Sequence, residues 1–104
     1  MNPIINSIHD LKNWLKDTAQ QIRQARAESK EFQRQHNGSY GSAHSKQVYL
    51  SWDYRHYHIA YCELRGRERS EIERPKKGNE PDETRIASIK DAILASIGAT
   101  KTPA

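Results

Sequence analysis

The stretch "HSKQVYLSWDYRHYHIAYCELR", residues 44–65, decides the fold because its pattern is compatible with two kinds of structure. Every second residue from Val48 to Tyr54 is large and apolar, which is typical of a strand. The stretch is nevertheless long, and it contains no turn signal before Gly66. In a helix, where successive residues are about 100° apart, the same apolar residues fall on two opposite sides. We therefore predict a helix over these residues.

That helix is expected at the centre of the fold, because both of its sides are apolar. One side carries Val48, Trp52, Ile59 and Cys62. The opposite side carries Leu50, Tyr54, Tyr57, Tyr61 and Leu64. A helix of this kind is usually covered by two neighbours. Gly66 is expected to follow its end as the C′ residue.

A first long helix is predicted over residues 7–35, where apolar and small residues recur three and four apart. Ser7 and Asp10 resemble a capping box in which Asp replaces the usual Glu or Gln. The segment "HNGSYGSAH", residues 36–44, contains two glycines and small polar residues, which predicts the loop that joins the two helices.

Two further helices are expected in the last third of the chain. A short one lies around Ser70–Arg74 and is stopped by Pro75. The last one opens at Pro81, has acids in its first turn and ends at Gly98. Its apolar face consists of Ile86, Ile89, Ile93 and Ile97.

The predicted fold class is therefore all-α, a small bundle of three main helices plus one short helix. At 104 residues, of which 35% are hydrophobic, the chain is expected to form one domain with a small core. That domain is predicted at residues 1–98, and residues 99–104 are expected to be a flexible tail.

Charge and composition narrow the class of partner. The net charge is +4 and the pI is about 9.3, which favours acidic partners such as nucleic acid. The single cysteine, Cys62, excludes an internal disulfide. No stretch approaches the ~20 apolar residues of a membrane span, and the first ten residues lack a secretory signal. We expect a cytoplasmic protein that does not contact a membrane.

His58 and Cys62 are the candidates for a metal or catalytic site, because residues four apart share one helix face. A zinc site would need further ligands, from His36, His44 or His56, and the usual paired spacing is missing. As a nucleophile and base, the pair would contain a thiol that apolar neighbours make inert. We predict no metal, no cofactor and no enzymatic activity.

The strongest functional pattern is a row of basic residues in the first helix, which we call the cation row. Its members are Lys12, Lys16, Arg23, Arg26, Lys30 and Arg34. Their spacing places them in one narrow stripe about 33 Å long, at ~1.5 Å per residue. Such a stripe can follow a nucleic-acid backbone. The alternative is that these side chains only cover the apolar face with their stems.

A second basic region is the corner "ELRGRERSEIE", residues 63–73, which contributes Arg65, Arg67 and Arg69 as candidate nucleic-acid contacts. It resembles the start of a helix-turn-helix of the sigma-factor and response-regulator kind, with Gly66 six residues before Ile72. The sequence departs from that family in two ways. The gap from Ile72 to Ile86 is longer, and the reading helix would open with the acidic "PDET".

Tyr54, Tyr57 and Tyr61 share one side of the central helix. They are expected either to form core against the last helix or to present an aromatic surface to a protein partner or to stacked bases. The stretch "RHYHIAYCELRGRERSEIE", residues 55–73, resembles short uncharacterised proteins encoded by bacteriophages. That resemblance implies an accessory or host-modulating protein that works by binding.

Two hypotheses about function follow. The first is a small basic protein of phage or mobile-element type that binds DNA or RNA and acts as an accessory or regulatory protein without catalysis. The second is a phage-type inhibitor of host defence, similar in kind to anti-CRISPR proteins. It would bind a host protein or a protein–nucleic-acid complex through the tyrosine side.

Overall fold

The computed structural model describes residues 5, 7–74 and 76–101, of which 97–101 are described by their backbone only. Its elements are α1 (Ile8–Gln35), α2 (Ser42–Leu64), α3 (Arg69–Ile72) and α4 (Glu83–Lys101). No strand occurs among these residues. The prediction of an all-α bundle of three main helices plus one short helix is confirmed.

The stretch that decided the fold is helical, and it ends where Gly66 predicts. Gly66 has a φ of 87°, in the left-handed region that glycine adopts without steric cost. Its N–H donates to the Glu63 carbonyl at 3.0 Å, and the Arg67 N–H donates to the Cys62 carbonyl at 3.0 Å. These two hydrogen bonds form a Schellman motif, which satisfies carbonyls that the helix end would leave unpaired.

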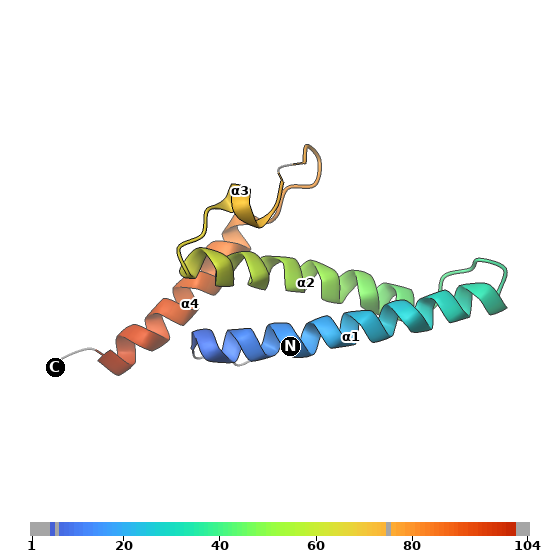
Figure 1. Cartoon of the computed structure of the whole chain (residues 1–104), viewed down its shortest axis with the longest axis horizontal. Coiled ribbons are helices and arrows are strands. Elements are labelled where there is room, and N and C mark those ends of the chain that lie inside the picture. The colour runs from blue at the N-terminus through green and yellow to red at the C-terminus, as the bar shows by residue number, and fades with distance from the viewer. Residues whose placement is uncertain (1–4, 6, 75, 102–104) are drawn as a thin grey trace.

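α1 and α2 form an antiparallel hairpin (Figure 1). At its start the Ser7 side chain accepts a hydrogen bond from the Asp10 N–H at 3.1 Å, which confirms the predicted cap. Between the helices the chain reverses through Asn37 and Gly38, whose φ values of 54° and 85° allow a tight turn.

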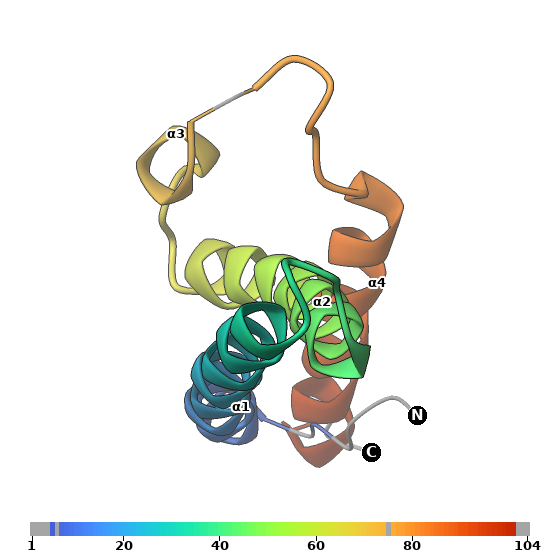
Figure 2. The same cartoon turned by 90° about the vertical axis from the view of Figure 1, so that its right-hand side faces the viewer.

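α2 contacts each of the other three helices, so its predicted central position is confirmed. Figure 2 shows α1 and α4 on two sides of α2, with α3 above it. The core lies where these helices meet and is formed by Leu11, Leu15, Tyr57, Ile59, Ala60, Ile86, Ile89 and Ile93. α4 therefore contributes the isoleucine face that its spacing predicted, as far as Ile93.

The molecule is elongated, with principal extents of 62 × 29 × 19 Å. Its radius of gyration is 16.5 Å, against ~13 Å for a compact domain of this size. The reason is that α4 covers only the C-terminal half of α2, so the loop end of the hairpin projects alone (Figure 1). Val48 and Trp52, predicted on a covered side, are consequently 56% and 45% exposed. That part of the prediction is wrong.

The end of α4 also differs from the prediction. The helix continues through Gly98 to Lys101, so glycine does not stop it. Residues 99–101 belong to α4, and residues 102–104 of the predicted tail lie outside the described part of the chain. Among the described residues, none of the helices combines the length and apolarity needed to cross a membrane.

A buried histidine fixes the start of α4 against α2. His56 is fully buried, and its Nε2 accepts a hydrogen bond from the Asp82 N–H at 2.8 Å. Because Nε2 accepts, the ring proton is on Nδ1, which donates to the Trp52 carbonyl at 2.8 Å. Both ring nitrogens are thus satisfied, and the backbone just before α4 is tied to the middle of α2.

We predict that His56→Ala destabilises the protein by about 2–4 kcal/mol. The substitution leaves a cavity in the core and removes the side-chain acceptor of the Asp82 N–H. The measurement is urea unfolding followed by circular dichroism. His9→Ala, on the exposed surface of α1, is the matched control and should change stability by less than about 0.5 kcal/mol. Equal effects of the two substitutions would contradict this role for His56.

Candidate nucleic-acid interface

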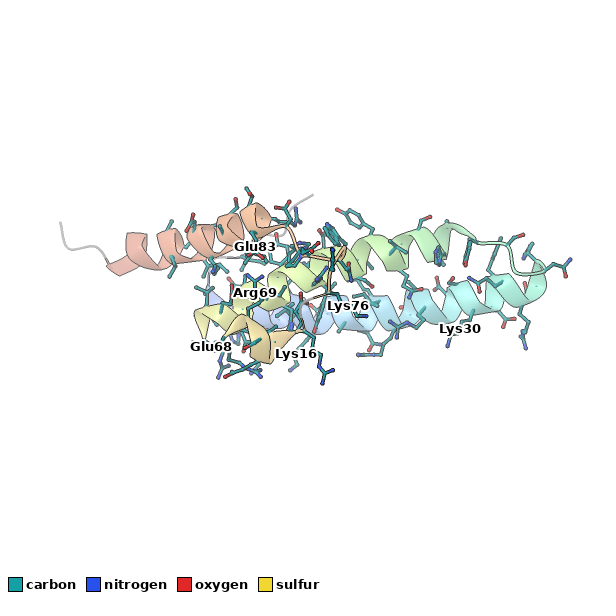
Figure 3. All side chains as sticks on the ribbon, turned by 90° about the horizontal axis from the view of Figure 1, so that it is seen from above. Lys16, Lys30, Glu68, Arg69, Lys76 and Glu83 are labelled. Carbon is teal, nitrogen blue, oxygen red and sulfur yellow. The ribbon has the colours of Figure 1, made fainter. Side chains whose placement is uncertain are left out.

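The cation row lies along one exposed edge of α1, and all six of its side chains are exposed. Figure 3 labels Lys16 and Lys30, which project from the same edge of the helix. Within the described part of the chain, Arg34 is the one member with an ion pair, to Glu31 at 2.5 Å. Arg23 donates to the neutral Gln20 amide at 2.7 Å. Most of the row is therefore positive charge without a compensating acid.

An open groove of about 490 Å³ runs between α1 and α2 beside this row. Lys12, Lys16 and Arg23 line it from α1, together with Leu15, Ala19 and Gln20. Tyr54, His58 and Tyr61 line it from α2. The structure thus brings half of the predicted cation row and two of the three predicted tyrosines to one place.

The aromatic wall of the groove is held in position by local contacts along α2. The rings of Tyr54 and His58 stack at 5.6 Å between centroids, with an interplanar angle of 11°. The Tyr61 hydroxyl accepts a hydrogen bond from Arg65 Nη1 at 2.7 Å. Arg65 also places its guanidinium carbon 5.5 Å from the Tyr61 ring centroid, a cation–π contact. The predicted cation Arg65 therefore supports Tyr61 without itself lining the groove.

The sequence indicated His58 as a candidate metal ligand or catalytic base, whereas in the structure it lines the groove. Burial, followed by the charge of Arg67, lowers its pKa below the ordinary histidine value. The ring is therefore neutral at neutral pH, and a neutral ring stacks like an aromatic side chain. The spacing 54, 58 and 61 on one helix face was the signal that could have placed His58 beside the two tyrosines.

Tyr57 does not belong to this surface, although it was predicted with Tyr54 and Tyr61. It is only 8% exposed and packs on Trp14 of α1, with ring centroids 4.4 Å apart. Burial raises its pKa above the ordinary tyrosine value. Its position on the helix turns it toward the junction with α4, where the Arg85 guanidinium carbon lies 5.8 Å from its ring centroid. Tyr57 is a core residue, and its prediction as a partner contact is wrong.

Arg69 joins three helices and is not available to a ligand as predicted. Its guanidinium pairs with Glu63 of α2 at 3.1 Å and with Glu83 of α4 at 2.5 Å. Lys90 of α4 pairs with the same Glu63 at 3.1 Å. Figure 3 shows Arg69 on the side of α3 that faces Glu83. Its donors are used inside the fold, so we assign Arg69 a structural role.

The rest of the basic corner is more open. Arg67 lies 3.8 Å from Glu71 in an exposed pair, which contributes little. α3 is a single turn, and α4 begins only after the loop, with Glu83 bound to Arg69. An acidic first turn repels phosphate, which argues against the start of α4 as a nucleic-acid contact.

His58 and Cys62, the candidates considered for a metal or catalytic site, are in contact. His58 Nε2 lies 3.6 Å from Cys62 Sγ, as the four-residue spacing on a helix requires. Cys62 is a free thiol and only 4% exposed. Across the part of the chain that the structure describes, no group of three or more His, Cys, Asp or Glu side chains is placed to hold a metal ion.

No protein-family model matches the chain, and no curated protein sequence or solved structure is significantly similar to it. The resemblance of residues 55–73 to short bacteriophage proteins stays a prediction, and so does the helix-turn-helix-like corner.

Glu63 and Glu83 are carboxylates whose pKa values are lowered by their partners in the fold. Burial alone would raise the pKa of Glu63, but hydrogen bonds from Arg69 and Lys90 outweigh it and hold the pKa below its usual value. The hydrogen bond from Arg69 likewise lowers the pKa of Glu83. A lowered native pKa contributes stability above the unfolded value of about 4.3, and that stability is lost as pH falls through the native pKa.

We predict that Glu63→Gln lowers stability at pH 7 by about 1–2 kcal/mol, because Arg69 and Lys90 lose a half-buried partner. The difference from wild type should shrink as pH falls from about 5 toward 3, because wild-type Glu63 then becomes protonated. Urea unfolding at pH 7, 5 and 3 measures both effects. The exposed Glu71→Gln is the control and should track wild type. A pH-independent difference for Glu63→Gln would contradict this assignment.

Proposed function

We propose that the protein is a non-enzymatic nucleic-acid-binding protein that uses the cation row and the adjoining groove. The observation that carries the proposal is the row itself, a line of exposed and mostly unpaired cations about 33 Å long on a rigid helix. Phosphates placed along this line would meet one cation every one to two turns of α1. Release of the counterions around those phosphates supplies most of the binding free energy.

The alternative explanation is that the row only covers the apolar surface of α1. It is weakened because α2 already covers that surface. Ile22, Ala25 and Ser29 form the inner face of α1 in the projecting part of the hairpin, and all three are buried. The α2 helix packs against α1 along the hairpin, so this face already has a cover. Arg26 and Lys30, on the edge of the same segment, are exposed with their charges toward solvent. Covering the core therefore does not require them.

The proposed biological role is that of an accessory or regulatory protein of phage or mobile-element type, acting in the cytoplasm. The predicted resemblance of residues 55–73 to short bacteriophage proteins is the reason for proposing this class. Contacts from lysine and arginine to phosphate carry no base information, so the row by itself provides affinity without sequence preference.

We predict that replacing Arg23, Arg26 and Lys30 with Gln weakens nucleic-acid binding and leaves the fold intact. Gln keeps a straight-chain stem and a good helix propensity, so the melting temperature should change little. The slope of log affinity against log salt should flatten by about 2–3 units, because up to three phosphate contacts are lost. Fluorescence anisotropy with labelled oligonucleotides across a salt series, together with a melting curve, measures this.

The matched control replaces Arg74, Lys76 and Lys77 with Gln, which removes three exposed cations from the loop before α4. Both triple variants reduce the net charge from +4 to +1, by subtraction of three. The control should keep the wild-type salt slope if the row is the contact surface. Equal losses in the two variants would show that only total charge matters and would remove the proposed site.

A second candidate function, docking on a host protein, is favoured by a different surface. Val48, Tyr49 and Trp52 are 56%, 59% and 45% exposed on the uncovered half of α2. An open pocket beside them is lined by Val48, Trp52, Arg74 and Lys76, among others. Such a surface suits a partner that presents an apolar anchor flanked by acids.

This second candidate predicts that Val48→Ser with Trp52→Ser abolishes binding of a protein partner recovered after nuclease treatment. Both side chains are exposed, so the double variant should melt near the wild-type temperature. Its salt slope for nucleic acid should also be unchanged. Recovery of the same proteins by wild type and variant would remove the docking hypothesis.

A further inference from the structure

We infer that the groove between α1 and α2 binds single-stranded nucleic acid, with unpaired bases on the α2 wall and the phosphate backbone along α1. This inference rests on the proposed function and specifies the form of nucleic acid that the site takes. It uses Tyr54, His58 and Tyr61 on one wall and Lys12, Lys16 and Arg23 on the other.

The aromatic wall favours unpaired bases because its rings are recessed between two helices. Tyr54 and Tyr61 are only partly buried and pack against the core, which limits their movement. The stack with His58 and the hydrogen bond from Arg65 hold the rings further. In a duplex the base faces are stacked inside the helix, and only base edges and phosphates are accessible. A ring inside a groove can stack only on a base that has left a duplex or never belonged to one.

The cationic wall on α1 matches a single nucleic-acid strand in length and charge. The hairpin is antiparallel (Figure 1). In the groove, Tyr61 is therefore expected opposite Lys12 and Lys16, and Tyr54 opposite Arg23. Lys16 to Arg23 and Tyr54 to Tyr61 are each seven residues apart, or about 10.5 Å at ~1.5 Å per residue. That length spans about three nucleotides at a spacing of ~3.4 Å per strand. The cations of α1 and the rings of α2 can therefore contact the same three or so nucleotides.

Beyond the groove, the row continues alone toward the loop end of the hairpin. Arg26 and Lys30 are exposed there and do not line the groove. They extend the phosphate track, so the whole row of about 33 Å covers at most about ten nucleotides at stacked spacing. Affinity should accordingly rise with oligonucleotide length and level off near ten nucleotides.

The test compares labelled dT₂₀, rU₂₀ and a 20-base-pair duplex by fluorescence anisotropy at one salt concentration. Wild-type protein should bind dT₂₀ or rU₂₀ at least about tenfold more tightly than the duplex. Tyr54→Leu with Tyr61→Leu should lose about tenfold or more on the single strands, because base–aromatic stacking contributes a factor of that size per ring. Its duplex affinity should be unchanged, which also shows that the variant is folded.

Two control variants make the result specific to the rings. Tyr54→Phe with Tyr61→Phe keeps both π faces and should retain most of the single-strand affinity. Tyr49→Leu removes a 59% exposed ring outside the groove and should bind like wild type.

The outcomes separate this inference from the proposed function. Equal affinity for single strand and duplex, together with unaffected binding by the Leu double variant, would overturn the single-strand inference while nucleic-acid binding stands. Absence of binding to all three probes at low salt would overturn the proposed function itself.

Discussion

Burial of the C-terminal half of α2 on two of its sides is the constraint on which the rest of the structure depends. Only 35% of the residues are hydrophobic, so the chain can build one small core, and it builds it there. α1 covers one side of α2 and α4 another, while His56 and the Glu63–Arg69–Glu83 ion pairs fix where α4 begins. Apolar burial stabilises the contact, and these polar contacts determine its geometry.

This arrangement explains why α1 has an exposed edge. α4 and α3 meet other sides of α2 (Figure 2). Neither contributes a residue to the lining of the groove that contains Tyr54 and Tyr61. Lys12, Lys16 and Arg23 of the cation row line that groove, and the rest of the row continues beyond it along α1. A polyanion would therefore meet positive charge first and aromatic surface second. The order matches steering by charge followed by short-range recognition.

Local patterns predicted much of this fold, and long-range contacts account for what they missed. The helix at 44–65, the Ser7 cap and the Gly66 C′ residue depend on neighbours within a few residues. The separation of buried Tyr57 from Tyr54 and Tyr61 depends on where α4 docks, which periodicity does not specify. Arg69 looked like a free cation because its partner Glu83 is 14 residues away across a loop. For the site, the sequence predicted the row and the tyrosines separately, and only the hairpin shows that they share a groove.

A backbone NMR titration with dT₁₀ tests the central claim most directly, because it reports on the amides of α1 and α2 at once. Binding at the proposed site should shift amide signals of residues 12–30 on α1 and 54–65 on α2. Signals from residues 44–52 of α2 and from the loop before α4 should stay in place. Shifts that cluster around Val48 and Trp52 instead, or signals that do not move even at low salt, would contradict the account.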